Sequence, residues 1–164
     1  MLTLYSLDDQ LIDAAFLSDI DDVRLLLGQG ANPDARDEEQ RTPLMNATTD
    51  CNRELVHVLL EAGADPNLRD QDGWTALDVA VYRKTLDIVW LLVHFGADVN
   101  AQDDTGSSVL VRALLACGGS TEIPDLLRRW GARDDLANAV GVSARALARR
   151  FGLALEQQDG PSAH

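Results

Sequence analysis

Apolar residues recur along the chain in short runs with the period of an α-helix, and polar turns separate the runs. The clearest run has apolar residues at i, i+1, i+4 and i+5, namely Leu55, Val56, Leu59 and Leu60. A shorter helix is predicted before it, because Thr42 is a good N-cap and Pro43 suits the first helical position. Gly63 is typical of the residue that follows a helix. The pattern therefore predicts a pair of helices joined by a turn.

This helix pair repeats along the chain. Gly-Ala pairs begin at Gly30, Gly63 and Gly96, in steps of 33 residues, and again at Gly131 after a step of 35. Four further sets of equivalent positions, which we call columns, keep the 33-residue step: Asp37, Asp70 and Asp103; Thr42, Thr75 and Ser108; Leu44, Leu77 and Leu110; Ala47, Ala80 and Ala113. A helix pair of this size cannot bury its apolar face alone, so the units are expected to stack on one another.

The motifs of each unit closely resemble the ankyrin repeat. The central unit contains DQDGWTAL at 70–77 and GADVN at 96–100, and the preceding unit contains TPL at 42–44. The resemblance runs from about Leu11 to about Gly152. It implies an all-α ankyrin-repeat solenoid of stacked helix-turn-helix units, about four units plus a half-unit C-terminal capping helix. The predicted single domain is 1–155, with units 5–36 (the N-terminal cap), 37–69, 70–102 and 103–137, a half-unit cap at 138–155, and a polar tail at 156–164.

The ends of the array and the third full unit depart from the repeat. No turn motif precedes the first unit, as expected for an N-terminal cap. In the last half-unit Arg145 stands in the leucine column, which predicts a solvated final helix. The third full unit has two additional residues at 117–121, between its helices. We expect a neutral surface loop there, with a contact role as the alternative.

The charge of the chain limits its partners. The 164 residues carry 27 acidic and 14 basic side chains, a net charge of −13, and 46% of them are hydrophobic. Such a surface opposes nucleic acids and anionic membranes. The start has no basic and apolar leader, and no apolar stretch is long enough to span a membrane. We therefore expect a cytoplasmic protein. Thirteen arginines against the single Lys84 suggest a GC-rich, bacterial genome.

No residue pattern in the sequence indicates catalysis, a cofactor or a metal. His57 and His94 fall on second helices of different units, and His164 is the last residue. The segment 70–73 resembles part of a calcium loop, but Leu68 and Val79 occupy positions where that loop needs ligands. We therefore expect no enzyme, no cofactor and no metal site.

The two cysteines are expected to be free thiols. Cys51 and Cys117 fall at one register position, two units apart. Packed helices lie about 8–10 Å apart, so this separation exceeds the roughly 7 Å limit for a disulfide.

The resemblance implies a protein-binding concave face, formed by the turn tips and the exposed ends of the first helices. By register, the candidate contact residues are Glu38, Glu39, Arg41, Thr49, Asp50, Gln71, Asp72, Trp74, Tyr82, Arg83, Asp104, Thr105, Ser107 and Leu115. Trp74 and Tyr82, ringed by carboxylates, have the composition of a binding hot spot. The alternative is that Trp74 packs over its neighbours and Tyr82 covers a helix end. Trp90 is expected to shield the backs of the outer helices, with an outer contact as the alternative, and Trp130 is expected in the core.

The leading hypothesis is a non-catalytic protein–protein interaction module that binds a basic protein through an acidic concave face, as an adaptor or regulatory subunit. One alternative is an immunity or inhibitor protein that neutralises a basic toxin or nuclease; an enzyme is a more distant one. We expect a free monomer with no nucleic-acid or membrane partner. The arginines of the last helix, Arg145, Arg149 and Arg150, leave nucleic-acid binding as the hypothesis to test against.

Overall fold

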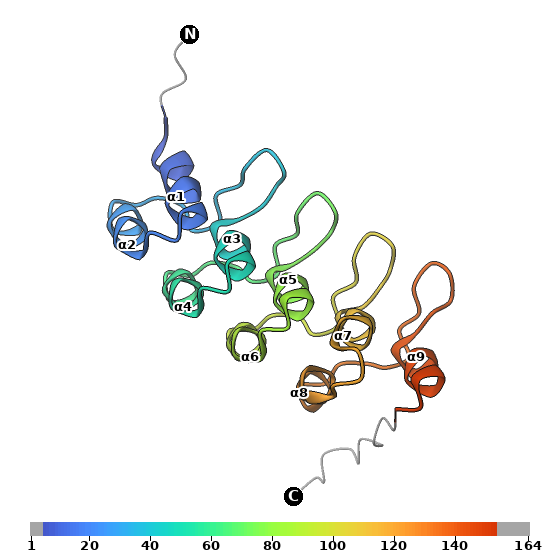
Figure 1. Ribbon diagram of the computed structural model, residues 1–164. Coiled ribbons are helices and arrows are strands. Elements are labelled where there is room, and N and C mark those ends of the chain that lie inside the picture. The colour runs from blue at the N-terminus through green and yellow to red at the C-terminus, as the bar shows by residue number, and fades with distance from the viewer. Residues whose placement is uncertain (1–4, 154–164) are drawn as a thin grey trace, which may run out of the picture.

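The computed structural model describes residues 5–153, and this part of the chain forms a helical solenoid (Figure 1). It contains nine helices: α1 (Leu7–Phe16), α2 (Ile20–Gly28), α3 (Pro43–Thr49), α4 (Arg53–Glu61), α5 (Ala76–Arg83), α6 (Leu86–His94), α7 (Val109–Cys117), α8 (Glu122–Arg129) and α9 (Ala144–Phe151). Between residues 5 and 153 there are no strands, only two isolated bridges, Gln102 to Ser108 and Ala137 to Ser143. The predicted all-α solenoid is confirmed.

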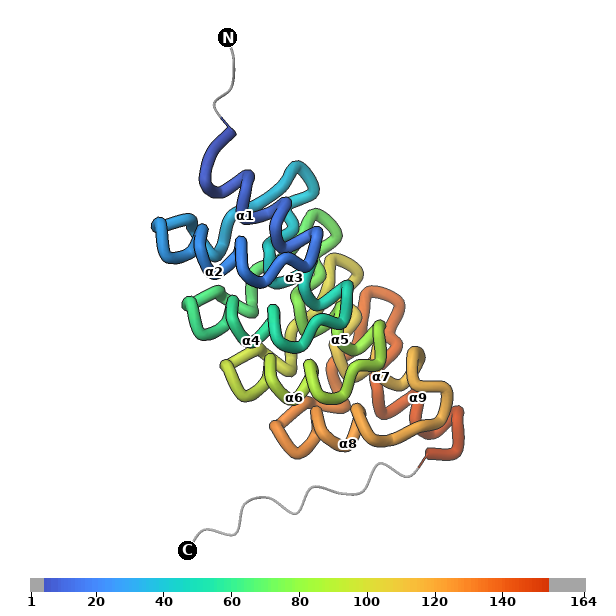
Figure 2. The backbone as a smooth tube through the Cα atoms, turned by 60° about the vertical axis from the view of Figure 1, so that its left-hand side comes forward, coloured from blue at the N-terminus to red at the C-terminus, as the bar shows by residue number. Residues whose placement is uncertain are grey.

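The helices stack in two parallel rows. The odd-numbered helices pack on one another in sequence, and so do the even-numbered helices α2 to α8 (Figures 1 and 2). Each odd-numbered helix up to α7 also packs on the even-numbered helix that follows it. We call the odd-numbered helices the inner row and the even-numbered helices the outer row. A long loop projects beside each of α3, α5, α7 and α9 (Figure 1); we call these loops, at 35–42, 68–75, 101–108 and 136–143, the fingers.

Each finger ends in a side-chain cap that starts an inner helix. The hydroxyls of Thr42, Thr75, Ser108 and Ser143 each accept a hydrogen bond from the backbone N–H three residues later. Pro43 follows the first of these caps and occupies the predicted first helical position. The predicted helix starts are therefore confirmed, and they fix the point at which every finger joins the inner row.

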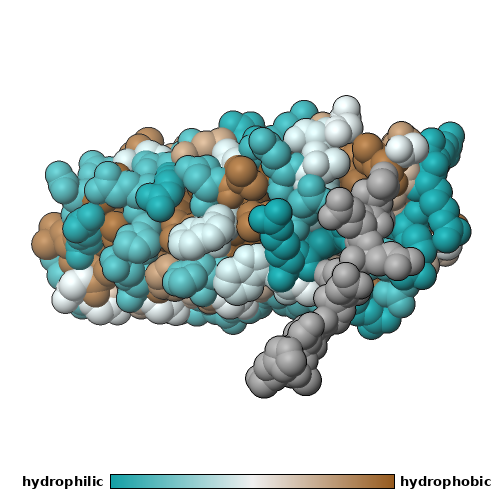
Figure 3. Space-filling model, turned by 90° about the horizontal axis from the view of Figure 1, so that it is seen from below, coloured by the Kyte–Doolittle hydropathy of each residue, from teal (hydrophilic) through white to brown (hydrophobic). Residues whose placement is uncertain are grey.

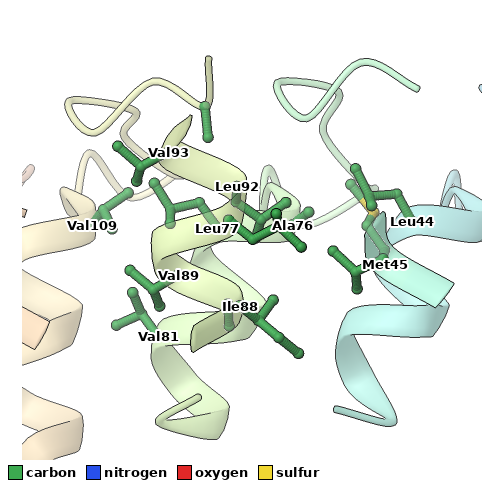
Figure 4. Packing of buried hydrophobic residues seen from close by; sticks show 14 of the residues in the cluster. Leu44, Met45, Ala76, Leu77, Val81, Ile88, Val89, Leu92, Val93 and Val109 are labelled. Carbon is green, nitrogen blue, oxygen red and sulfur yellow. The ribbon is translucent and has the colours of Figure 1, made fainter. Parts of the chain in front are cut away.

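The core between the rows is aliphatic. The stripe predicted on the second helix, Leu55, Val56, Leu59 and Leu60, is buried, as are the leucine and alanine columns. Figure 4 shows side chains of α3, α5, α6 and α7 meeting in this core. Small alanine side chains at Ala47, Ala80 and Ala113 have no exposed surface, which allows neighbouring helices to approach closely.

Aromatic side chains lie outside this core. None of the eight, at positions 5, 16, 74, 82, 90, 95, 130 and 151, falls in the buried class. The prediction that Trp130 belongs to the core is wrong, because its side chain is 46% exposed. It caps the end of α8, a position whose equivalents Gln29 and Ala62 are also exposed.

The additional residues of the third unit change the register of one cysteine. The first helices of the earlier units are followed by a left-handed residue, Ser18, Cys51 or Lys84. In the third unit that residue is Gly118, because α7 ends one register position later than α5 does. Cys117 therefore lies in the last turn of α7, one position before the equivalent of Cys51, which corrects the shared register. Both cysteines are free thiols, as predicted.

The final helix is solvated as predicted. Arg145 of α9 is exposed and forms two hydrogen bonds with the carboxylate of Asp134, at 2.6 and 3.1 Å. The leucines of this column are covered in the other units, whereas α9 has no second helix among the described residues. An arginine is compatible with this position because it does not need to be buried there.

Candidate protein-interaction surface

The repeated aspartate folds each finger. The Oδ1 atom of Asp70 accepts hydrogen bonds from the backbone N–H groups of Asp72 (3.0 Å) and Trp74 (2.9 Å). Asp37 and Asp103 make the same pair of bonds in their own fingers. In the last finger the Oδ1 atom of Asn138 accepts the same two bonds, from Val140 and Val142. Asn138 follows Asp103 by 35 residues, so the 33-residue spacing does not reveal it. The side-chain oxygens of this column are therefore engaged in folding the fingers, and asparagine can replace aspartate there.

Side chains at the bases of the fingers join each finger to the next. Arg69 donates to the backbone carbonyl of Gly73 in its own finger (3.0 Å) and to that of Gln102 in the following finger (2.6 Å). Arg36 does the same one unit earlier, with Gln40 (3.2 Å) and Arg69 (2.8 Å). These bonds fix the distance between neighbouring fingers, so the finger tips form an ordered row.

The fourteen predicted contact residues are all at least partly exposed. Ten are exposed: Glu38, Glu39, Asp50, Gln71, Asp72, Tyr82, Arg83, Asp104, Thr105 and Leu115. Four are half-buried: Arg41, Thr49, Trp74 and Ser107. They lie on the fingers and at the C-terminal ends of α3, α5 and α7, so they share one side of the solenoid, which we call the inner face (Figure 1).

Trp74 and Tyr82 contact each other on the inner face. Their ring centroids are 5.7 Å apart at an interplanar angle of 66°, an edge-to-face arrangement. The guanidinium of Arg112 lies over the indole of Trp74, 3.9 Å from the ring centroid. The structure shows the packing of Trp74 over its neighbours, which leaves it half-buried, whereas Tyr82 is 61% exposed. The contact role of this pair stays a prediction.

Arg112 also holds two carboxylates beneath Trp74. Its guanidinium binds Asp78 of α5 (3.1 Å) and Asp103 of the third finger (2.6 Å). All three side chains are largely buried, with exposed fractions of 14% for Arg112, 1% for Asp78 and 8% for Asp103. The repeat pattern of the sequence does not predict this cluster. The spacing of Thr75 and Asp78, which form a capping box, was the available signal.

The two carboxylates of the cluster respond to burial differently. Burial raises the pKa of Asp78 above its ordinary value, and hydrogen bonds with Thr75 and the nearby Arg112 only partly offset this. Burial also acts to raise the pKa of Asp103, but hydrogen bonds from Thr105, Ser107 and Arg112 outweigh it, so that pKa is lowered. Asp103 therefore contributes a stable negative charge on which Arg112 is oriented.

Charge is divided across the inner face. Glu38, Glu39 and Asp72 are exposed on finger tips and make no ion pair among the described residues. Asp104 pairs with Arg69 at 3.2 Å. Arg41, nearer the helices, donates to Asn46 (3.1 Å) and Thr49 (2.7 Å). The helix ends carry apolar and arginine side chains together with Asp50, whose carboxylate accepts a hydrogen bond from the Ser18 hydroxyl (3.2 Å).

A second aromatic group lies on the outer row. Trp90 is 44% exposed and stacks on His94, with centroids 5.0 Å apart and an interplanar angle of 7°. His94 in turn contacts Phe95. On the face shown in Figure 3, hydrophobic residues are interspersed with hydrophilic ones. Trp90 therefore packs within its own helix and the adjoining turn, and this group contains none of the predicted contact residues.

Residues 5–153 contain no cluster of three side chains suited to hold a metal ion. In the same part of the chain, no helix has the length and apolar character needed to cross a membrane.

Comparisons with known proteins identify the family. No curated protein matches the chain. The family model for ankyrin repeats, in three copies, matches residues 11–103, more than half of the sequence. Proteins of this family generally mediate protein–protein interactions and are typically non-catalytic. The motifs, the stacked helix pairs and this match agree, and the chain belongs to the ankyrin-repeat family.

Proposed function

We propose that the chain is a non-catalytic adaptor or regulatory subunit that binds a protein with a basic surface through its inner face. The observation that carries this proposal is the contacting pair Trp74 and Tyr82, which lies beside the unpaired carboxylates of the finger tips. Tryptophan and tyrosine are enriched among the residues that dominate binding energy at protein interfaces.

The pair is held in place before a partner arrives. Arg112 covers one part of the Trp74 indole, and Asp78 and Asp103 fix Arg112 in turn. A side chain that is already ordered loses little conformational freedom on binding, which favours affinity. The buried cluster therefore supports the contact role of Trp74 as well as the fold.

Electrostatic attraction favours a basic partner. The net charge of −13 and the free carboxylates of Glu38, Glu39 and Asp72 would steer such a partner towards the finger tips. The same charge opposes self-association, and we propose that the free chain is a monomer. Association should slow as salt is raised, because salt screens exposed charges beyond about 8 Å at physiological ionic strength.

Affinity capture from a lysate of the source organism tests the proposal. The baits are the wild type, the variant Trp74→Ala/Tyr82→Ala and the outer-row control Trp90→Ala, each used at low and moderate salt. We expect the wild type and the control to capture the same basic protein, identified by mass spectrometry, and the inner-face variant to lose it.

The single variant Tyr82→Ala separates binding from folding. Tyr82 is exposed, so its loss should leave the helical circular dichroism and the unfolding transition unchanged. Retention of the same proteins by this variant and by the double variant, with both folded, would contradict the proposal.

A further inference from the structure

Exposed apolar side chains recur at the C-terminal ends of the inner helices. Phe16 of α1, Tyr82 of α5 and Leu115 of α7 are 68%, 61% and 58% exposed. They occupy one register position, separated by multiples of 33 residues, and Thr49 of α3 occupies the same position between the first two. We call Phe16, Thr49, Tyr82 and Leu115 the inner-row stripe.

The spacing of the inner-row stripe excludes a β-strand and fits two helical peptide geometries. Packed helices lie about 8–10 Å apart, so the stripe offers one side chain at each such step. An α-helix laid along the solenoid advances about 10.5 Å in seven residues. A polyproline II helix repeats every three residues, or about 9.3 Å, and is the alternative that the test below separates from the α-helix. A β-strand presents the same side every two residues, or about 6.8 Å, and does not keep this step. A helix with one apolar residue per heptad therefore contacts each inner helix in turn.

Free carboxylates run beside the inner-row stripe. Glu38 and Glu39 lie on the first finger and Asp72 on the second, all exposed. The first two tips are tied together, because the backbone N–H of Gln71 donates to the carbonyl of Glu39 at 3.1 Å. The fingers follow the inner helices unit by unit, so the two rows run side by side. A partner helix needs lysine or arginine on the side that faces the fingers.

We infer that the inner face binds an amphipathic, basic α-helix of about 22 residues that lies across α1, α3, α5 and α7. Three helix spacings from Phe16 to Leu115 span about 24–30 Å, and a helix that presents four residues seven apart needs about 22 residues. This inference rests on the proposed function and specifies the class of partner. It assigns apolar residues of the partner to every seventh position and basic residues to the adjacent side.

Thr49 adds a specificity determinant. Its hydroxyl accepts a hydrogen bond from Arg41 (2.7 Å) and donates one to the carbonyl of Met45 (2.9 Å), so it is held against its own helix. At α3 the inner-row stripe therefore presents a small side chain that projects less from the helix than Phe16 and Tyr82 do. The partner residue that faces α3 should be larger than those that face α5 and α7.

Selection from two displayed peptide libraries tests the inference. One library presents randomised 22-residue segments on a stable helical scaffold, and the other presents extended, proline-containing segments of the same length. The bait is the full chain, and enriched clones are then measured against Tyr82→Ala/Leu115→Ala. The matched control is Leu25→Ala/Trp90→Ala, which removes two exposed apolar side chains from the outer row.

We expect enrichment from the helical library, with apolar residues seven apart, an excess of lysine and arginine, and the largest apolar residue facing α3. The inner-row variant should weaken these clones at least about tenfold, and the control should leave them unchanged. Enrichment of acidic helices, or of helices without the heptad pattern, would overturn the inference.

Failure of the inference is distinguishable from failure of the proposed function. If only extended segments are enriched, and the inner-row variant loses them, the helical partner is wrong and the binding face stands. If neither library yields clones, the helix is again wrong, and capture of a basic protein from the lysate decides the proposed function. Clones that bind the inner-row variant and the wild type with equal affinity would overturn both the helical partner and the proposed function.

Discussion

Individual aspartates of this chain fall into different groups, although the sequence presents them as one acidic field. Asp37, Asp70 and Asp103 bind backbone N–H groups of their fingers. Asp78 caps a helix and binds Arg112. Asp72 is exposed on a finger tip and makes no ion pair among the described residues. All of these side chains count towards the net charge of −13, but only carboxylates of the last kind are free to form a direct ion pair with a partner.

Gln40 occupies a backbone conformation that suits glycine. Its φ of 62° lies in the left-handed region, where the other fingers have Gly73, Gly106 and Gly141. We expect Gln40→Gly to raise the free energy of unfolding by about 0.5–1 kcal/mol, because relief of the left-handed strain exceeds the entropic cost of glycine. Urea denaturation followed by far-ultraviolet circular dichroism measures the change.

The reverse substitution in the next finger is the control. A Cβ atom at Gly73 would lie 2.4 Å from Oδ1 of Asp104 and 2.7 Å from Nη2 of Arg69. Gly73→Ala should destabilise the protein, because the φ of 77° at this position is strained for alanine and the Cβ atom would displace the Arg69 and Asp104 side chains. A Gln40→Gly variant less stable than the wild type would contradict the argument from backbone strain.

The charge of Asp103 should stabilise the fold at neutral pH and lose this effect in acid. Its lowered pKa means that the folded state binds this proton less readily than the unfolded state. The contribution is therefore complete above the ordinary aspartate pKa of about 3.9 and is lost as the pH falls through the lower folded-state value. We expect Asp103→Asn to cost about 1–2 kcal/mol at pH 7, with a smaller difference from wild type at pH 3.

Asp70→Asn is the matched control for this pH experiment. Asparagine keeps the finger bonds, as Asn138 shows, and Asp70 has no ion pair to lose among the described residues. Equal costs at pH 7 for both substitutions would show that the finger bonds, and not the contact with Arg112, account for the effect.

At the scale of the helix, repeated positions were predictable and exceptions to the repeat were not. Thr42, Thr75 and Ser108 were recognisable as caps because each hydroxyl bonds to the backbone N–H only three residues later, so the interaction can be read from the local sequence. Trp130 was misplaced because one apolar residue beside a turn glycine does not reveal whether another helix covers it. The longer α7 was hidden because an insertion of two residues can enter either the helix or the loop.

The start of α5 should depend on a hydroxyl more than the other helix starts do. Thr75 accepts from the N–H of Asp78 and donates to the Asp78 carboxylate, at 3.3 and 2.9 Å. We expect Thr75→Ala to lower the free energy of unfolding by about 2 kcal/mol, at the upper end for a cap, because the buried carboxylate loses a donor. Thr75→Ser keeps both bonds and should cost less. Thermal unfolding of the two variants makes the comparison, and equal losses would exclude the hydroxyl as the cause.

At the scale of the whole molecule, the architecture followed from the sequence but the details of the inner face did not. A 33-residue repeat with helical periodicity dictates stacked helix pairs, since no unit can bury its own apolar side. The register also placed Trp74 and Tyr82 on one side. The position of Arg112 over Trp74 depends on a contact between neighbouring units, which no pattern within one unit can show.

Stability should decrease from the centre of the array towards its C-terminal end. The helix α5 packs on α3, α6 and α7, whereas α9 packs mainly on α7. We expect backbone amides of α9 to exchange with deuterium about tenfold faster than those of α5, a difference of about 1.4 kcal/mol in opening free energy. Mass spectrometry of peptic fragments resolves the two helices.

A cap substitution tests whether the end opens independently. Ser143→Ala removes the bond to the N–H of Ala146 and should accelerate exchange in α9 alone. Equal acceleration in α5 would show that the array opens as one unit and would contradict the gradient.

The aliphatic core has a spectroscopic consequence. Trp74, Trp90 and Trp130 all retain solvent contact, so their emission in the folded protein is already that of partly hydrated indoles. Unfolding should therefore shift the emission maximum only slightly, and fluorescence should underestimate the transition that circular dichroism detects. A ligand that covers Trp74 should instead shift the emission to the blue, which makes the native chain its own optical sensor of events on the inner face.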